Sequence, residues 1–201
     1  VSVPDANAFV NSQSTIIQYS NGEEIGRIGS ENRQIVPLAK IPMNVRHAVL
    51  AAEDRSFYSN RAFSITGIAR AVLNNLRGGS LQGGSTITQQ YVKQILFTAA
   101  TTKEEQEAAI AVSLNRKIRE ARYAIGLENK LSKQEILEGY LNIAYFGAGS
   151  YGVEIASQRY FSKSASELTL SEAATLAGLV QNPSKYDPTR FPERAENRRN
   201  D

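Results

Sequence analysis

The sequence predicts a mainly α-helical protein that carries one short β-hairpin near its start. Apolar residues recur at helical spacing over most of residues 43–189, and strands and helices do not alternate along the chain. A Rossmann or barrel fold is therefore disfavoured. Of the 201 residues, 41% are hydrophobic and 21% charged, as in ordinary globular domains. We expect a linker and hairpin at 1–42, the main domain at 43–189 and the start of a second linker at 190–201.

Composition excludes several classes of site. The chain has no cysteine, so it has neither disulfides nor thiolate metal ligands. Its one histidine, His47, excludes a multi-histidine metal site and is assigned no role. A net charge of +3 is too small to indicate a nucleic-acid partner. The sequence has no run of 18 apolar residues, so it predicts no transmembrane helix. From the residues at its two ends we expect the chain to be an excerpt from a longer protein.

The expected elements follow in order. Two strand-like runs within residues 15–28 flank Asn21-Gly22, the preferred dipeptide of a type I′ turn. A helix spans residues 44–54 with Asn44 as its N-cap, and another follows Ser64 up to residues 78–79. Further helices begin after residues 85–86, at 102 (a long helix to about 129), at 132 and at 169, the last three with capping boxes. Residues 145–152 are a glycine- and aromatic-rich loop.

Glu53 and Asp54 end a helix that is otherwise built from small apolar residues. A carboxylate beside an apolar face can have a raised pKa and serve as a general base or acid. The alternative is a solvated charge pair, which pattern alone favours. However, acidic residues at a helix C-terminus oppose the helix dipole, and such a placement is better tolerated when the residue has a function.

Two glycine pairs precede the helix that starts near Ser85 and Thr86. Free backbone N–H groups at a helix start can bind an anion, although the segment lacks the lysine of a nucleotide-binding P-loop. The alternative is a flexible turn with an N-cap. Gln89 and Gln90 favour a binding role, because paired exposed amides suit the hydroxyls of a sugar.

A basic cluster surrounds one carboxylate after residue 115. Arg116 and Glu120 are four residues apart and share a helix face. A glutamate among cations can bind a metal cation or orient a phosphate, whereas the commoner alternative is a solvated, salt-bridged face. The cluster comprises Arg116, Lys117, Arg119, Glu120 and Arg122, and Arg70 and Lys93 on preceding helices are further candidates.

Five segments in this order resemble the motifs of the peptidoglycan glycosyltransferases of family 51, the domain of class A penicillin-binding proteins and monofunctional transglycosylases. They are EDRSF (53–57), GGSTITQQYVK (83–93), RKIREARYAIGLE (116–128), KQEILEGYLN (133–142) and SEAATLAGLVQNPSKYDP (171–188). The resemblance implies a lysozyme-like helical head with a small flexible jaw. It also implies that lipid II is polymerised into β-1,4-linked glycan strands, with inversion and release of undecaprenyl diphosphate.

The resemblance also implies residue roles. Glu53 matches the family's general base, and Glu120 the glutamate that assists diphosphate departure, through a divalent metal (Mg²⁺ or Mn²⁺) or neighbouring cations. The matching substrate-binding residues are Arg70, Ser85, Thr86, Gln89, Gln90, Lys93, Arg116 and Lys117. Two positions depart from the family's first motif, since Asn60 replaces the usual His and Ala62 the usual Gly. We expect Ala62 to tighten or shift the loop beside Glu53 if that position requires positive φ.

The expected partners are lipid II, the growing glycan strand and the membrane surface on its extracytoplasmic face. A transpeptidase domain and moenomycin-type inhibitors follow from the resemblance. An interfacial apolar surface could come from Phe57, Phe63, Leu81, Ile95, Leu96 and Phe97, although core packing suits most of them better. Two alternatives stay open: a lysozyme-like hydrolase or lytic transglycosylase, and an inactive module that binds lipid II.

Overall fold

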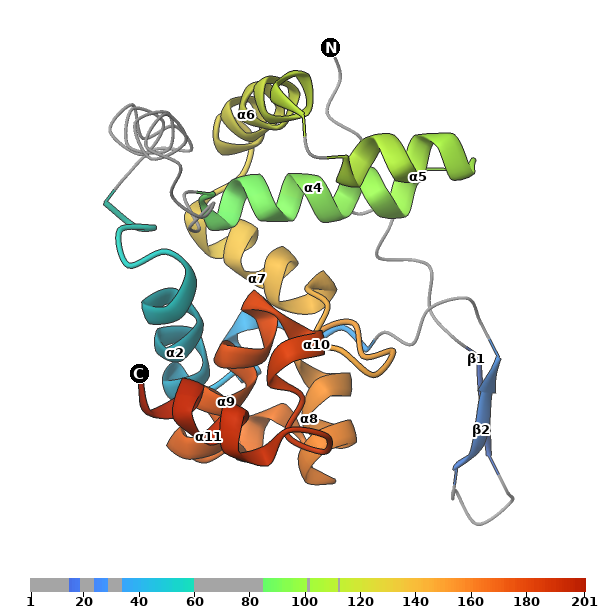
Figure 1. Ribbon diagram of the computed structural model, residues 1–201, viewed down its shortest axis with the longest axis vertical. Helices are drawn as coiled ribbons and strands as arrows, with labels where there is room; N and C mark the ends of the chain where they lie inside the picture. The colour runs from blue at the N-terminus through green and yellow to red at the C-terminus, as the bar shows by residue number, and fades with distance from the viewer. Residues whose placement is uncertain (1–14, 19–23, 29–33, 60–84, 101, 112) are drawn as a thin grey trace. The chain divides into compact units, whose positions relative to one another are not determined.

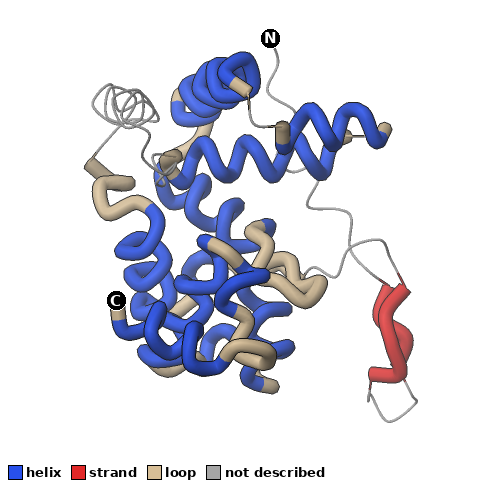
Figure 2. The backbone as a smooth tube through the Cα atoms, in the orientation of Figure 1, coloured by secondary structure: helices blue, strands red, loops and turns tan. Residues whose placement is uncertain are grey.

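The computed structural model describes residues 15–18, 24–28, 34–59, 85–100, 102–111 and 113–201. These residues are mainly helical (Figure 2), which confirms the predicted class. The chain forms two compact units. The first lies within Leu50–Tyr140, and the second combines Asp5–Val49 with Leu141–Asp201. The expected helix after Ser64 lies outside the described residues, and the head, jaw and domain boundaries stay predictions.

In the first unit, α4 (Ile87–Ala99) packs against both α5 (Lys103–Ile110) and α6 (Leu114–Glu128) (Figure 1). The unit also holds the end of α2 (Met43–Glu53) and most of α7 (Lys133–Ile143). Capping residues set the helix starts, as the sequence predicts. Thr86 Oγ1 accepts from Gln89 N at 3.2 Å, and Thr102 forms a reciprocal capping box with Glu105.

The predicted long helix from residue 102 to about 129 is wrong. The chain leaves the helical conformation around Ala111 and starts a new helix at Ser113, whose hydroxyl accepts from Arg116 N at 3.2 Å. The Arg116 side chain also donates to the carbonyl of Ala111, which would accept from a backbone N–H if the helix were continuous. The Ser113 cap and this local side-chain hydrogen bond therefore replace the missing helical hydrogen bonds at the break.

The core of the first unit is built on one face of α4, where buried residues recur at helical spacing. Phe57, only 1% exposed, and Ile95, 2% exposed, belong to this core, so neither contributes to an interfacial surface. Phe63 and Leu81 lie outside the described residues. The buried apolar residues of this unit include Phe57, Ile87, Tyr91, Val92, Ile95, Ala124, Leu127, Ile136, Leu137 and Tyr140.

The second unit begins with β1 (Thr15–Gln18) and β2 (Glu24–Ile28), which pair antiparallel with Thr15 opposite Ile28. The expected turn residues Asn21-Gly22 lie outside the described part of the chain. The unit continues through η1 (Leu38–Lys40) and the start of α2. The later elements are α8 (Val153–Phe161), η2 (Ala165–Glu167), α9 (Leu170–Gln181), α10 (Pro183–Tyr186) and α11 (Pro192–Asn200).

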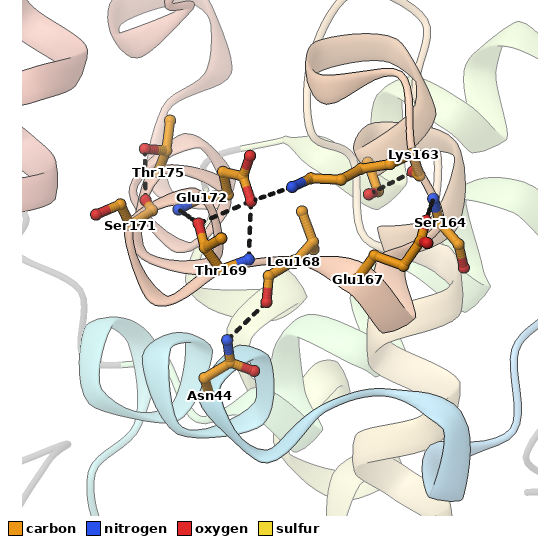
Figure 3. Close-up of polar contacts among 10 residues, drawn as sticks. Asn44, Lys163, Ser164, Glu167, Leu168, Thr169, Ser171, Glu172 and Thr175 are labelled. Atoms are coloured by element: carbon orange, nitrogen blue, oxygen red, sulfur yellow. Dashed lines mark hydrogen bonds and ion pairs between the residues drawn. The ribbon is translucent and has the colours of Figure 1, made fainter.

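Polar side chains fix the helix ends of this unit. Figure 3 shows Glu172, in the first turn of α9, accepting from the backbone and hydroxyl of its N-cap Thr169 and pairing with Lys163 at 2.8 Å. Asn44, expected as an N-cap, instead lies inside α2, and its amide donates to the carbonyl of Leu168 at 2.8 Å. Pro42 accounts for the earlier helix start, because its carbonyl accepts from Val45 N.

The loop at 145–152 is turn-rich, as predicted, with positive φ at residues 147, 148, 149 and 152. A Cβ at Gly152 would lie 2.6 Å from the carbonyl oxygen of Asn142, so only glycine fits there. Among the described residues, no helix has both the length and the apolar character needed to cross a membrane.

Candidate functional site

Glu53 is the last residue of α2 and is half-buried. Its Oε2 accepts a hydrogen bond from Gln90 Nε2 on α4 at 2.7 Å. This donor offsets part of the unfavourable placement of a carboxylate at a helix C-terminus. The structure thus places the predicted base against the helix that carries the predicted sugar-binding amides.

Asp54 fixes the turn that follows Glu53. Its Oδ2 accepts from Ile87 N, at the first turn of α4, at 3.1 Å, and its Oδ1 accepts from the Ser56 hydroxyl at 3.3 Å. Together with the Thr86 cap, this contact uses two of the N–H groups that start α4. The protein's own oxygen atoms therefore satisfy two of the free N–H groups that could bind an anion, as the alternative of an N-cap predicts, and anion binding at this helix start stays a prediction.

A hydrogen bond and an ion pair also anchor α4. Thr88 is fully buried, and its hydroxyl donates to Glu128 Oε1 at 2.6 Å. The same oxygen pairs with Lys133 Nζ at 2.6 Å, and that ammonium lies 4.6 Å from the centre of the Phe57 ring. Residues from α4, α6 and α7 and from the segment after Glu53 are thereby joined, which limits how α4 can shift.

The two glutamines are not the exposed pair that the sequence suggests. Gln89 is 9% exposed, and both ends of the Gln90 amide have partners, since its Oε1 accepts from the hydroxyl of Tyr140 at 3.2 Å. Tyr140 is 1% exposed, and burial, followed by the charge of Glu53, raises its pKa well above the usual value. Sequence reasoning missed Tyr140, because on α7 it has the spacing of an ordinary core residue.

The cation cluster forms around Glu120 as the helical spacing predicts. Arg116 Nη1 pairs with Glu120 Oε1, and Lys117 Nζ lies 3.4 Å from Glu120 Oε2. Glu120 is almost fully buried, with 2% of its side chain exposed, whereas 43% of the Lys117 side chain is exposed. Lys117 Nζ also donates to the Ser85 hydroxyl at 2.6 Å, which joins the start of α4 to the cluster.

Lys93 on α4 belongs to the same electrostatic cluster. Burial, chiefly, and then the charges of Arg116 and Lys117 lower its pKa, while Glu120 acts in the opposite direction. Three cations against one carboxylate leave an excess of positive charge, which suits an anionic ligand. Arg70 lies outside the described residues. Arg119 and Arg122 are exposed on the same helix.

Lys93 and Gln90 are three residues apart on α4. Side chains at this spacing share a helix face, with Cβ atoms about 5–6 Å apart. One turn of α4 therefore carries a partner of Glu53 and a member of the cation cluster.

The expected metal site does not fit the residues that the structure describes. Among them, no three His, Cys, Asp or Glu side chains are grouped so that they could hold a metal ion. Both oxygens of Glu120 face cations, whose charges would oppose a divalent ion. The divalent metal stays a prediction of the resemblance, and no step proposed below depends on it.

These features define a helical domain that pairs a hydrogen-bonded carboxylate with a cation cluster suited to an anionic substrate. Residues 21–201 match the family model described as Transglycosylase, and the chain belongs to this family.

Relatives found by sequence agree with this assignment. The chain is 48% identical over its whole length to penicillin-binding protein 1A of Mycobacterium tuberculosis, of which it covers 24%. It is 40% identical over 96% of its length to penicillin-binding protein 1A of Streptococcus oralis, covering 29% of that protein. The chain thus spans about a quarter of the length of the curated relatives it matches. The 2.6 Å crystal structure of penicillin-binding protein 1A from Haemophilus influenzae is similar over 94% of this chain and 17% of that chain, at 29% identity and a TM-score of 0.47.

Proposed function

We propose that this chain is a peptidoglycan glycosyltransferase that polymerises lipid II into β-1,4-linked glycan strands. The observation that carries the proposal is the spacing on α4, which puts the partner of Glu53 and the cation cluster one helix turn apart. Glycosyl transfer from a diphosphate carrier requires this pair of functions, since a proton leaves the acceptor while a diphosphate leaves the donor.

Glu53 acts as the general base in this proposal. Its carboxylate takes the proton of the 4-hydroxyl of an incoming GlcNAc unit, and the hydroxyl oxygen attacks the anomeric carbon of the growing strand. The Gln90 amide orients the carboxylate through its 2.7 Å hydrogen bond. Attack opposite the leaving group converts the α-linked donor into a β-linked product.

The cation cluster receives the leaving group. As the bond between the anomeric carbon and the diphosphate oxygen breaks, negative charge develops on undecaprenyl diphosphate. Lys117 and Lys93 stabilise this charge, and Arg116 holds Glu120 beside them. Lys117 is the most accessible of the three cations, because its side chain is 43% exposed while that of Arg116 is 9% exposed.

A hydrolase or lytic transglycosylase is the second candidate. Such an enzyme also needs a carboxylate, but it cleaves a glycan whose leaving group carries no charge. Its reaction therefore does not require a cluster in which three cations surround one buried carboxylate, because no negative charge develops on the leaving group. The cluster favours the transferase.

The proposal extends to the surroundings of the reaction. Lipid II is membrane-embedded, so we place the domain at the membrane surface on its extracytoplasmic face. The names of the relatives support the proposal that this domain acts together with a penicillin-binding transpeptidase domain. Moenomycin-type inhibitors are expected to compete for the site of the growing strand.

Polymerisation of purified lipid II in detergent tests the proposal. The unaltered chain should form glycan polymer, and Glu53→Gln should slow it by at least about 100-fold, because general base catalysis is lost. Glu104→Gln, which neutralises an exposed carboxylate on α5, should have no effect. Polymerisation by Glu53→Gln at the normal rate would refute the assigned base. Release of new reducing ends from preformed peptidoglycan, with no polymer, would instead support the hydrolase.

A further inference from the structure

Two hydrogen bonds connect the hydroxyl of Tyr140 to the carboxylate of Glu53. The Tyr140 hydroxyl lies 3.2 Å from Gln90 Oε1, and Gln90 Nε2 lies 2.7 Å from Glu53 Oε2. We call these residues the Tyr140–Gln90–Glu53 chain. It runs from the interior of α7, through α4, to the half-buried end of α2.

Packing alone does not account for a tyrosine at this position. Tyr140 belongs to a buried stripe of α7 with Ile136, Leu137 and Leu141, where a phenylalanine ring would fill the same space. A hydroxyl in such a place costs stability unless it finds a partner, and here its partner is the carbonyl end of the Gln90 amide. The polar atom is therefore directed at a residue of the site.

The direction of each hydrogen bond follows from the chemistry of the groups. An ionised carboxylate can only accept, so it takes an N–H from the Gln90 amide. The amide oxygen then points the other way and needs a donor. Burial keeps the Tyr140 hydroxyl protonated by raising its pKa, so it is always able to donate.

We propose that Tyr140 is a positioning residue: by donating to Gln90 Oε1, it holds the amide in the orientation that presents N–H to the base Glu53. Without this hydroxyl, the amide keeps its bond to Glu53 but loses its second anchor, and the carboxylate samples orientations that do not reach the acceptor hydroxyl. Because a small misplacement of a reacting group has a large effect on rate, the loss should appear in kcat. This inference rests on the proposed function.

The test is a double-mutant cycle in the lipid II assay, using Tyr140→Phe, Gln90→Leu and the double variant. Tyr140→Phe should lower kcat by about tenfold with KM unchanged. In the Gln90→Leu background it should lower kcat no further, because the intermediate residue is gone. Tyr160→Phe is the matched control, since it deletes another hydroxyl hydrogen bond, 3.0 Å to the carbonyl of Phe146, in the second unit. Its kcat should be unchanged.

Thermal melting followed by circular dichroism separates folding from positioning. All proteins are assayed at a temperature at which the melts show every one of them folded, so a purely structural loss is removed before rates are compared. A Tyr140→Phe variant with normal kcat would overturn the inference, as would an equal further loss in the Gln90→Leu background. Either result, obtained while the unaltered chain polymerises lipid II, leaves the proposed function intact. Failure of the unaltered chain to polymerise would count against the proposed function itself.

Discussion

Replacing Arg116 by methionine should destabilise the first unit strongly, because it leaves Glu120 buried without its main partner. Only 9% of the Arg116 side chain and 2% of the Glu120 side chain are exposed, so neither charge is solvated in the native state. Removing one partner of a buried pair costs about 3–5 kcal/mol. Lys117 Nζ, 3.4 Å from the other carboxylate oxygen, remains and places the expected loss near the lower limit, at about 3 kcal/mol.

The partner substitution sharpens this expectation. In Arg116→Met/Glu120→Gln, no uncompensated charge is buried, so about half or more of the lost stability should return. Arg122→Met, an exposed arginine on the same helix, should change stability by less than about 0.5 kcal/mol. Urea unfolding followed by far-UV circular dichroism measures the free energy of unfolding of the three variants and the unaltered chain. The reasoning fails when Arg116→Met unfolds at the same midpoint as the unaltered chain, or when the double variant is less stable than the single one.

Two further predictions concern pH. Glu120→Gln removes the charge that supports the protonated form of Lys93, so the pKa of Lys93 should fall further. The variant should then lose its affinity for inorganic diphosphate at a lower pH than the unaltered chain does. Calorimetry across a range of pH values measures this affinity. An unmoved or raised alkaline limit would contradict this, and Lys93→Arg should abolish the limit. The second prediction uses Glu172, whose pKa is lowered to about 2, first by its hydrogen bond with Lys163 and then by that with Thr169. Because the pKa of Glu172 in the folded chain lies below its ordinary value of 4.5, Glu172→Gln should reduce stability above pH 4.5, and the difference from the unaltered chain should vanish as pH falls toward 2. Urea midpoints at a series of pH values measure it; a pH-independent difference would count against it, and Lys163→Met should remove most of the dependence.

Local signals predicted the helix starts well. Thr102, Ser132 and Thr169 each form the reciprocal contacts expected of a capping box, because the two bonded residues are three apart and need no tertiary information. The break before α6 was missed for the converse reason. Ser113 lacks a glutamate three residues later, and the side chain that stabilises the break belongs to Arg116, whose role there depends on the fold.

The candidate site likewise has features that local spacing predicts and features that depend on the tertiary fold. The pairing of Arg116 with Glu120 could be predicted, because helical spacing alone brings the two residues together. The hydrogen-bond partners of the Gln90 amide and the position of Tyr140 beside it could not, since periodicity shows that a residue faces inward but not which polar group it meets. Their hydrogen bond joins residues 50 positions apart in the sequence.

The position of Gln90 and Lys93 on one continuous helix limits how this family member can vary. Each residue inserted between them would turn one side chain about 100° around the helix axis relative to the other. The proposed base Glu53 and the cations proposed to stabilise the leaving group would then no longer face the same substrate. Asp54 and Glu128 hold the start of α4, so the helix cannot easily rotate to compensate. Insertions and deletions should therefore be excluded from residues 90–93, while substitutions on the outer face of α4 are tolerated.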